Sequence, residues 1–231
     1  MMSTIPNDNL IERHRVAYYG GSFDPPHNGH LAIADALVDK FGLDSFVFIP
    51  AFHAPHKARL KPTSAYDRYT MLCLATQSAA KMRVSRMEIE MPERPYSVET
   101  LTRILTVRPD DDIYFVIGAD SWRDIRTWRE WEKVLTMVNI IVVTRPGVEI
   151  GFDHVTDEIR DRIVDMRAGS DSARNEQTAS SIEPSIFITD AVNMDISATE
   201  IRRKIREGDS TWQEDVTPEV ANYVEKYQIY S

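Results

Sequence analysis

Cysteine is nearly missing from this sequence, since Cys73 is its only one in 231 residues. A single cysteine excludes a disulfide framework within the chain, and an unpaired thiol is what a reducing cytosol allows. Cys73 lies in an apolar stretch with helical spacing, where a small core residue is far commoner than a nucleophile. We therefore expect a cytoplasmic protein that folds without covalent cross-links.

Long apolar runs and an excess of positive charge are also missing. No stretch approaches the ~20 apolar residues that a membrane-spanning helix requires, and residues 1–15 lack the apolar core of a secretory signal. The formal net charge is −9, whereas a general nucleic-acid binder is usually basic. We expect neither a membrane nor a nucleic acid as partner. An acidic chain can still bind a phosphorylated small molecule where a few cations and backbone amides converge.

The residues that are present follow two alternating periodicities. Patterns typical of strands occupy residues 15–19, 45–50, 82–90, 113–117, 139–144 and 186–189. Patterns typical of helices occupy residues 29–40, 64–80, 98–106, 128–137, 197–207 and 217–227. This alternation predicts an α/β fold, with a doubly wound parallel sheet and helices on both faces. Such sheets bind ligands at the carboxyl ends of their strands, near the point where the strand order reverses.

One domain is expected to account for most of the chain. We predict an N-terminal tail over residues 1–14 and a single domain over residues 15–231. Residues 148–183 are long for a connection, and we interpret them as an insertion. Within it, residues 155–166 place their apolar side chains on one helical face, which predicts a helix. Residues 168–183 are rich in Ser, Asp, Asn, Glu and Gln, and are interpreted as a mobile surface loop.

The strongest chemical signal follows the first expected strand, where residues 20–30 read GGSFDPPHNGH. Two glycines after a strand let the backbone approach a phosphate closely. A helix that begins at Asn28 and Gly29 presents free amides and the positive end of its dipole to the same anion. His27 and His30 lie on one face of its first turn, where imidazole donors suit phosphoryl chemistry. A histidine-capped Gly/Pro-rich turn is the purely structural alternative, and it accounts for a lone H-x-x-H better than for the whole string.

This string resembles the H-x-G-H signature of the nucleotidyltransferase superfamily, which has a Rossmann-like α/β fold. That superfamily includes the nicotinate and nicotinamide mononucleotide adenylyltransferases, phosphopantetheine adenylyltransferase and the cytidylyltransferases. The form G-G-[ST]-F-D-P-x-H-x-G-H is similar to that of the nicotinate mononucleotide branch. The resemblance runs from about residue 15 to the C-terminus, and nothing transfers to residues 148–183.

A second string, residues 196–202, reads ISATEIR and resembles the superfamily motif I-S-S-T-x-I-R. Ser197 is a good helix N-cap, and the amides of the first turn are free to bind an anion. Thr199 and Arg202 reach the same end of that helix. Ala198 departs from the motif, which usually has a hydroxyl at this position. Without the first string, an ordinary capped helix with an exposed arginine would explain these residues equally well.

Three further segments resemble motifs of the nicotinate mononucleotide branch of the superfamily. Residues 54–57 read APHK and resemble a P-P-H-[KR] loop, whose histidine and lysine would face the phosphates. Residues 95–101 read PYSVETL and resemble S-Y-T-x-D-T-L. Residues 142–147 read VVTRPG and also follow the branch pattern.

Another segment bears on the pyridine ring. Residues 118–120 read GAD and are followed by Trp128 and Trp131, which resembles G-A-D…W-[YF]. The resemblance implies that Asp120 contacts a ribose and that Trp128 stacks on the ring, whereas Trp131 is expected in the core. Arg129 departs from the Tyr or Phe that is usual at this wall of the pyridine pocket.

Together these resemblances imply transfer of an adenylyl group from ATP to nicotinate mononucleotide in NAD biosynthesis, giving nicotinate adenine dinucleotide and pyrophosphate. They assign the catalytic roles to His27, His30, Lys57 and Arg202. They assign ATP binding to Gly20, Gly21, Ser22, Phe23, His27, His30, Gly118, Ile196, Ser197, Thr199 and Arg202. They assign mononucleotide binding to His56, Lys57, Tyr96, Ser97, Asp120, Trp128, Arg129 and Arg145. Mg²⁺ is expected to arrive with ATP, without a metal site on the protein. ATP and nicotinate mononucleotide are thus the expected partners, together with a second copy of the chain in a homo-oligomer.

Other interpretations stay open. The nicotinamide mononucleotide and phosphopantetheine adenylyltransferases share the superfamily, although the 54–57 loop and Trp128 disfavour phosphopantetheine. A non-catalytic nucleotide sensor on the same fold is another alternative, but binding alone would not need His27, His30 and Arg202 together. A zinc site is a further alternative, because His27 and His30, with His53 and His56, form two H-x-x-H pairs. A pyrophosphate-release assay separates an enzyme from the sensor and from the zinc site, and a side-by-side assay with acid and amide mononucleotides addresses the acceptor.

Overall fold

The computed structural model describes residues 13–52, 63–144, 150–167, 183–192 and 194–230. These residues form a seven-stranded sheet in the order β3-β2-β1-β4-β5-β7-β6, and every neighbouring pair is parallel. The strands are β1 (Arg15–Gly21), β2 (Ser45–Pro50), β3 (Met82–Val84), β4 (Asp112–Gly118), β5 (Asn139–Val143), β6 (Ile163–Asp165) and β7 (Ile186–Thr189). The predicted doubly wound parallel sheet is confirmed.

The strand order reverses between β1 and β4. From β1 the chain proceeds outward through β2 to β3, and it then returns to place β4 on the other side of β1. The carboxyl ends of β1 and β4, at Gly21 and Gly118, therefore lie beside each other at the switch point. A doubly wound sheet opens its ligand crevice at this position.

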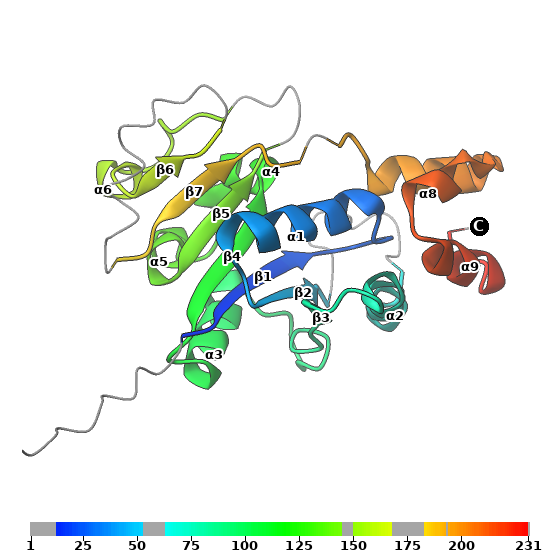
Figure 1. Ribbon diagram of the computed structural model, residues 1–231, viewed down its shortest axis with the longest axis horizontal. Helices are drawn as coiled ribbons and strands as arrows, with labels where there is room; N and C mark the ends of the chain where they lie inside the picture. The colour runs from blue at the N-terminus through cyan, green and yellow to red at the C-terminus, as the bar shows by residue number, and fades with distance from the viewer. Residues whose placement is uncertain (1–12, 53–62, 145–149, 168–182, 193, 231) are drawn as a thin grey trace, which may run out of the picture.

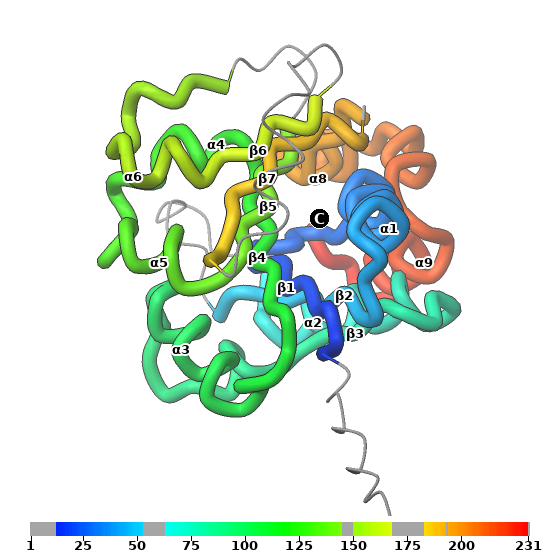
Figure 2. The backbone as a smooth tube through the Cα atoms, turned by 60° about the vertical axis from the view of Figure 1, so that its left-hand side comes forward, coloured from blue at the N-terminus to red at the C-terminus, as the bar shows by residue number. Residues whose placement is uncertain are grey.

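Helices cover both faces of the sheet (Figure 1). Figure 2 shows α1 on one side of the strands, with α3, α5 and α6 on the other. The helices are α1 (Asn28–Phe41), α2 (Ala65–Thr76), α3 (Ser97–Val107), α4 (Ala119–Arg123), α5 (Trp131–Met137), α6 (Asp157–Arg160), α8 (Ala198–Glu207) and α9 (Pro218–Lys226), with 3-10 turns η1 (Ile125–Thr127) and η3 (Ser210–Asp215). Along β1, Val16 and Tyr18 enter the core beneath α3, whereas Ala17 enters the core beneath α1. This alternation is the period of two that a buried strand requires.

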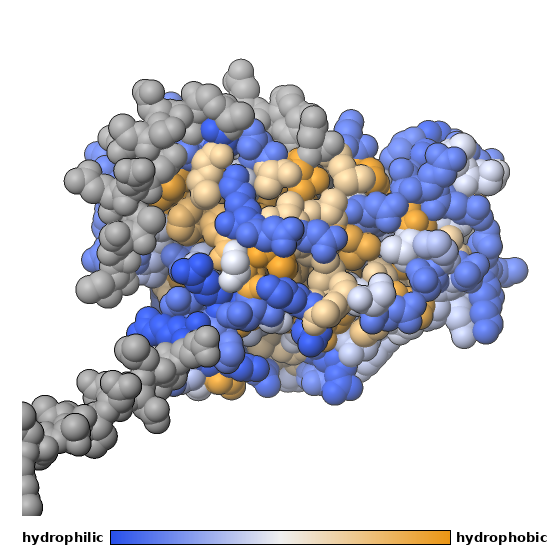
Figure 3. All heavy atoms as spheres, in the orientation of Figure 1, coloured by the Kyte–Doolittle hydropathy of each residue, from blue (hydrophilic) through white to orange (hydrophobic). Residues whose placement is uncertain are grey.

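A third apolar cluster joins the C-terminal helices to α2. Met71 on α2 packs with Ile201 on α8 and with Val220 and Val224 on α9. In the space-filling view, hydrophobic residues gather at the centre of the face that carries α1, whereas the outer surface of α8 and α9 is mostly hydrophilic (Figure 3). The C-terminal helices are thus held to the rest of the molecule by their inner faces.

The helix that carries the first motif has clear ends. His27 is its N-cap in extended backbone conformation, and Lys40 lies in the last turn, where a cation complements the helix dipole. Gly42 ends the helix with φ of 57°, a left-handed conformation that favours glycine. These two caps define where α1 begins and ends, and its first turn directly follows the glycine loop.

Two predicted elements are wrong. Residues 82–90 form a strand only over Met82–Val84, because β3 pairs with β2 only that far; the turns that follow still bury Ile89. The helix predicted for residues 155–166 is limited to Asp157–Arg160, and Ile163–Asp165 is a strand instead. Pairing with β7 satisfies the backbone of this strand and buries Val164, so tertiary contacts override the helical spacing.

Candidate active site

The glycine loop after β1 is shaped by the ring of Phe23. A Cβ on Gly21 would lie 2.9 Å from that ring, so only glycine allows the chain to fold back here. The Phe23 ring is 2% exposed and lies edge-on to Tyr19 and His30, with its centroid 4.9 Å from that of His30. Phe23, predicted as an ATP-binding residue, therefore supports the imidazole of His30 from the core with its ring.

The two motif histidines stack on each other. Their ring centroids are 3.6 Å apart with an interplanar angle of 28°, and His27 is 6% exposed. The backbone amide of His27 donates to Nδ1 of His30 at 3.1 Å. Because Nδ1 accepts this bond, the neutral His30 ring carries its proton on Nε2. The fold thereby fixes His30 as a hydrogen-bond donor through Nε2.

Arg202 connects the second motif to the first. Its Nη1 donates to the carbonyl oxygen of Asp24 in the glycine loop, and its Nη2 donates to Oγ1 of Thr199 at 3.1 Å. Ser197 is the N-cap of α8, as predicted, although its side chain makes no capping hydrogen bond. The neighbouring Ile196 approaches Gly29 on α1. Arg202 and Asp24, which are 178 positions apart in the chain, are thus brought together.

Two cavities open at the carboxyl ends of the strands. The smaller joins both motifs to the end of β4, because His27, His30, Gly118 and Ile196 all line it. The larger has a volume of about 320 Å³. Its lining includes the predicted site residues Gly20, Gly21, Ser22, Tyr96, Ser97, Trp128 and Arg129. Most of the described residues that were predicted to bind ligand therefore line one of two cavities beside the switch point.

The aromatic wall of the 320 Å³ cavity is Trp128. The helix predicted from residue 128 begins only at Trp131, and Trp128 is in extended conformation after η1. Its half-buried ring lies 6.5 Å from that of Phe115, which also lines the cavity. Trp131 packs against the core, as predicted.

A guanidinium forms another part of this cavity. Arg129 lies over the ring of Tyr96, with 4.9 Å between the guanidinium carbon and the ring centroid. Its Nη1 pairs with Oε1 of Glu99 at 3.3 Å, while Oε2 of Glu99 accepts the amide of Tyr96 at 2.9 Å. The residue that departs from the expected Tyr or Phe is therefore braced by α3.

The sequence did not single out Glu88, which also lines the 320 Å³ cavity. Its carboxylate accepts a hydrogen bond from Oγ1 of Thr100 at 2.8 Å. Burial raises the pKa of Glu88 above its ordinary value, and the hydrogen bond from Thr100 opposes this shift. No motif marked this residue, because its place depends on turns that follow β3.

Some predicted site residues lie elsewhere. Asp120 lies in the first turn of α4, but its side chain is 65% exposed and pairs with Arg123 at 3.2 Å. Thr199 contacts Arg202 and lines neither cavity. His56, Lys57 and Arg145 are outside the described residues.

Comparisons with known proteins agree with this geometry. A family model described as cytidylyltransferase-like matches residues 18–204. The chain belongs to the cytidylyltransferase-like family. A relative in Corynebacterium glutamicum named "Probable nicotinate-nucleotide adenylyltransferase" is 33% identical, with 94% of this chain and 89% of the relative covered. A relative of the same name in Solibacter usitatus is 35% identical, with 94% and 100% covered.

Solved structures show the same fold. The structure titled Plasmodium falciparum nicotinic acid mononucleotide adenylyltransferase complexed with NaAD superposes with a TM-score of 0.67. It is 18% identical in sequence, and 94% of this chain and 98% of that chain are covered. The predicted resemblance to the nucleotidyltransferases and the predicted Rossmann-like α/β fold are both confirmed for this cytidylyltransferase-like protein.

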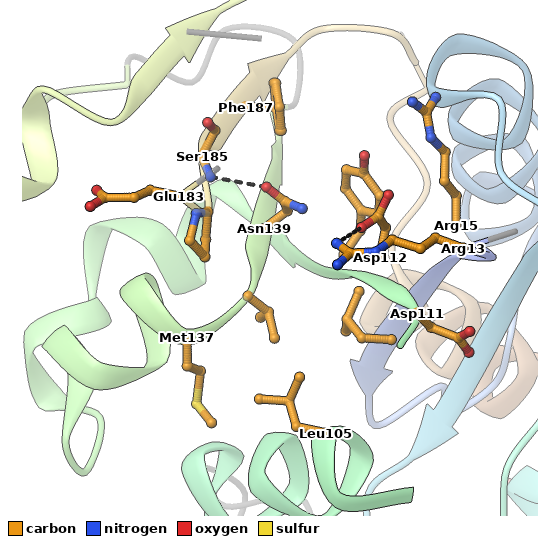
Figure 4. Close-up of a pocket in the computed structure, with 14 residues that line it drawn as sticks. Arg13, Arg15, Leu105, Asp111, Asp112, Met137, Asn139, Glu183, Ser185 and Phe187 are labelled. Atoms are coloured by element: carbon orange, nitrogen blue, oxygen red, sulfur yellow. Dashed lines mark hydrogen bonds and ion pairs between the residues drawn. The ribbon is translucent and has the colours of Figure 1, made fainter. Parts of the chain in front are cut away.

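A cavity of about 600 Å³ in this member of the cytidylyltransferase-like family lies at the opposite end of the sheet. It is lined at the amino ends of the strands, where Arg13 pairs with Asp112 at 3.6 Å and the amide of Ser185 donates to Asn139 at 3.0 Å (Figure 4). Its described lining includes none of the predicted site residues. The carboxyl ends of the strands, where the two motifs meet, are therefore the candidate active site.

Proposed function

We propose that this protein is a nicotinate-nucleotide adenylyltransferase, which transfers the adenylyl group of ATP to nicotinate mononucleotide and releases pyrophosphate. The observation that carries this conclusion is the agreement between its relatives and its site. Relatives with that name match about 94% of the chain. In the structure, a cavity with an aromatic wall lies beside the glycine and histidine loop, and this arrangement supports phosphate binding by that loop.

The reaction is an in-line displacement at phosphorus. The 5′-phosphate of the mononucleotide attacks the α-phosphorus of ATP, and pyrophosphate leaves from the opposite side. The second pKa of a phosphate monoester is ~6, so the attacking group is already anionic at neutral pH and needs no general base. The protein supplies alignment of two anions and neutralises the charge that grows during transfer.

The histidines and the second motif hold the triphosphate. His30 donates from Nε2 to the transferring phosphoryl group, and His27 supports it from the stacked position. The amides at the start of α8, with Ser197 and Thr199, hold the β- and γ-phosphates together with Arg202. Lys57 adds a further cation to these phosphates. Gly118 leaves room for the nucleotide at the end of β4, where a Cβ would meet nothing within 4 Å.

The 320 Å³ cavity takes the mononucleotide. Trp128 stacks on the pyridine ring, whose cationic nitrogen adds a cation–π attraction. The backbone amides of Ser97 and Arg129 bind the carboxylate of nicotinate. Asp120 reaches the ribose by exchanging its exposed ion pair with Arg123, which costs little in free energy. His56 and Arg145 contribute to the phosphate end of the mononucleotide.

Mg²⁺ enters with ATP. Within residues 13–52, 63–144, 150–167, 183–192 and 194–230, no group of three or more His, Cys, Asp or Glu side chains is arranged to hold a metal ion. We propose that Mg²⁺ would be bound mainly by the phosphate oxygens of ATP and by water, as this ion prefers. When bound with ATP, Mg²⁺ would supply positive charge beside the leaving pyrophosphate.

The cellular location and the oligomeric state of the enzyme stay predictions. In the described part of the chain, no helix is long and apolar enough to cross a membrane. We propose a cytoplasmic location, where ATP and mononucleotides are available, and a homo-oligomeric state. An assay with different acceptors tests the nicotinamide mononucleotide and phosphopantetheine alternatives. Any turnover excludes the non-catalytic nucleotide sensor.

The test of this function compares acceptors in wild type and in Trp128→Ala. Wild type is expected to form a dinucleotide and pyrophosphate from ATP and nicotinate mononucleotide, with kcat/KM about 5–150-fold above that for the amide, because an amide leaves donors unpaired at ~1–3 kcal/mol. Trp128→Ala is expected to raise KM for the mononucleotide about 2–30-fold, which corresponds to ~0.5–2 kcal/mol of cation–π attraction.

The matched control is Trp131→Phe, because Trp131 packs against the core. This variant is expected to keep KM for both substrates. Equal use of acid and amide by wild type defeats the proposed selectivity. Turnover of phosphopantetheine, or of no acceptor, defeats the assignment, and an unchanged KM in Trp128→Ala defeats the stacking role alone.

A further inference from the structure

The C-terminal end of the chain returns to the glycine loop. After α9, a turn closes with the amide of Ile229 donating to the carbonyl of Val224 at 3.0 Å. Ile229 and Tyr230 then pack against the apolar cluster that α2, α8 and α9 share. In Figure 1 the C-terminus lies beside α8 and α9, at the end of the molecule where α1 begins.

From this position Tyr230 bonds to the first motif. Its Oη donates to Oδ1 of Asp24 at 2.7 Å, across 206 positions of sequence. Asp24 is 6% exposed and lies three residues before His27. Burial, and then the Asp24 carboxylate, raise the pKa of the Tyr230 hydroxyl, so it stays protonated and remains a donor at neutral pH.

Asp24 thus accepts hydrogen bonds from two side chains of the C-terminal segment. Its carboxylate accepts from Tyr230, and its carbonyl oxygen accepts from Arg202. A second tie lies on the other side of His27, where Nδ2 of Asn28 donates to the carbonyl of Glu214 in η3 at 3.0 Å. The C-terminal segment therefore holds the motif at both flanks of His27, at Asp24 and at Asn28.

We propose that Tyr230 is a positioning residue for adenylyl transfer, whose hydroxyl fixes Asp24 and so holds His27 and His30 in alignment. This inference rests on the proposed function. The ring of Tyr230 and its apolar neighbours supply packing, whereas the hydroxyl supplies a single directed bond to the loop. Catalytic groups that are misplaced by about 1 Å lose as much as a hundredfold in rate.

The experiment compares Tyr230→Phe with Tyr227→Phe. Tyr230→Phe keeps the ring and removes the bond to Asp24, and kcat is expected to fall roughly ten- to hundredfold, with KM for ATP within threefold of wild type. Tyr227 lies in the same turn and is 57% exposed. Removing its hydroxyl in Tyr227→Phe is expected to leave kcat unchanged. Circular dichroism verifies that each variant is folded at the assay temperature.

A double-variant cycle tests the route through Asp24. If Tyr230 acts through this carboxylate, adding Asp24→Asn to Tyr230→Phe costs no more than the worse single change. Strictly additive losses, or wild-type kcat in folded Tyr230→Phe, overturn the inference. A wild type that makes no dinucleotide overturns the proposed function instead, so the two failures are distinguishable.

Discussion

Replacing His30 with alanine is expected to lower kcat by a hundredfold or more while the fold survives. The Nδ1 atom of His30 accepts the amide of His27, so the proposed donor to the transferring phosphoryl group is Nε2. Removing one such donor from a preorganised site costs ~3 kcal/mol of transition-state stabilisation. Because the bond is made in the transition state, kcat and kcat/KM should fall together while KM for ATP changes little.

His14→Ala is the matched control for this variant. His14 precedes β1 at the opposite end of the sheet, and its side chain is 60% exposed. Its replacement is expected to leave kcat unchanged. Steady-state pyrophosphate release measures kcat and KM, and thermal denaturation verifies the fold. A folded His30→Ala enzyme with kcat within threefold of wild type contradicts the role given to this histidine.

Replacing Arg68 with methionine is expected to lower stability by about 3 kcal/mol, or roughly 6–12 °C in Tm. Arg68 lies on α2 and is 1% exposed. Its guanidinium donates to the carbonyl oxygens of Ser22 at 2.6 Å and Ala51 at 2.5 Å, and also to those of Thr63 and Phe52. Methionine fills the space of the stem but leaves these buried oxygens without their donor.

Arg68 also joins the loop after β1 to the loop after β2, so kcat is expected to fall in the same variant. Burial lowers the pKa of Arg68, although an arginine stays charged at neutral pH. Arg86→Met is the control, since Arg86 is 60% exposed and pairs only at the surface with Glu90. A Tm of Arg68→Met within 2 °C of that control contradicts the cross-linking role.

Sequence motifs predicted those parts of the candidate site whose residues lie close together in the chain. His27 and His30 share one helical turn, and the second motif shares another, so neighbouring letters were enough to place them. Arg68 and Tyr230 could not be found in this way, because their partners in the glycine loop, Ser22 and Asp24, lie 46 and 206 positions away. A buried arginine and a solvated one look alike in a helical pattern until the facing loops are known.

The wrong elements have the same origin. The apolar residues over 155–166 do have helical spacing, but Ile163–Asp165 pairs with β7. Periodicity within a segment gives no information on pairing with a strand elsewhere in the chain. Trp128 was predicted to begin a helix, and it lies instead in extended backbone on the cavity wall. The sheet, by contrast, was predictable because most of its strands are continuous apolar runs bounded by Gly, Pro or Asn.

The most direct test of the central claim is the configuration at phosphorus in the product. In the proposed mechanism the site aligns the acceptor phosphate and ATP for one in-line displacement, with no covalent enzyme intermediate. Wild-type enzyme is given a single phosphorus diastereomer of ATP that carries sulfur on the α-phosphate, with nicotinate mononucleotide as acceptor. The account predicts inversion of configuration in the phosphorothioate dinucleotide. Retention, which requires two displacements through an adenylylated side chain, would contradict it.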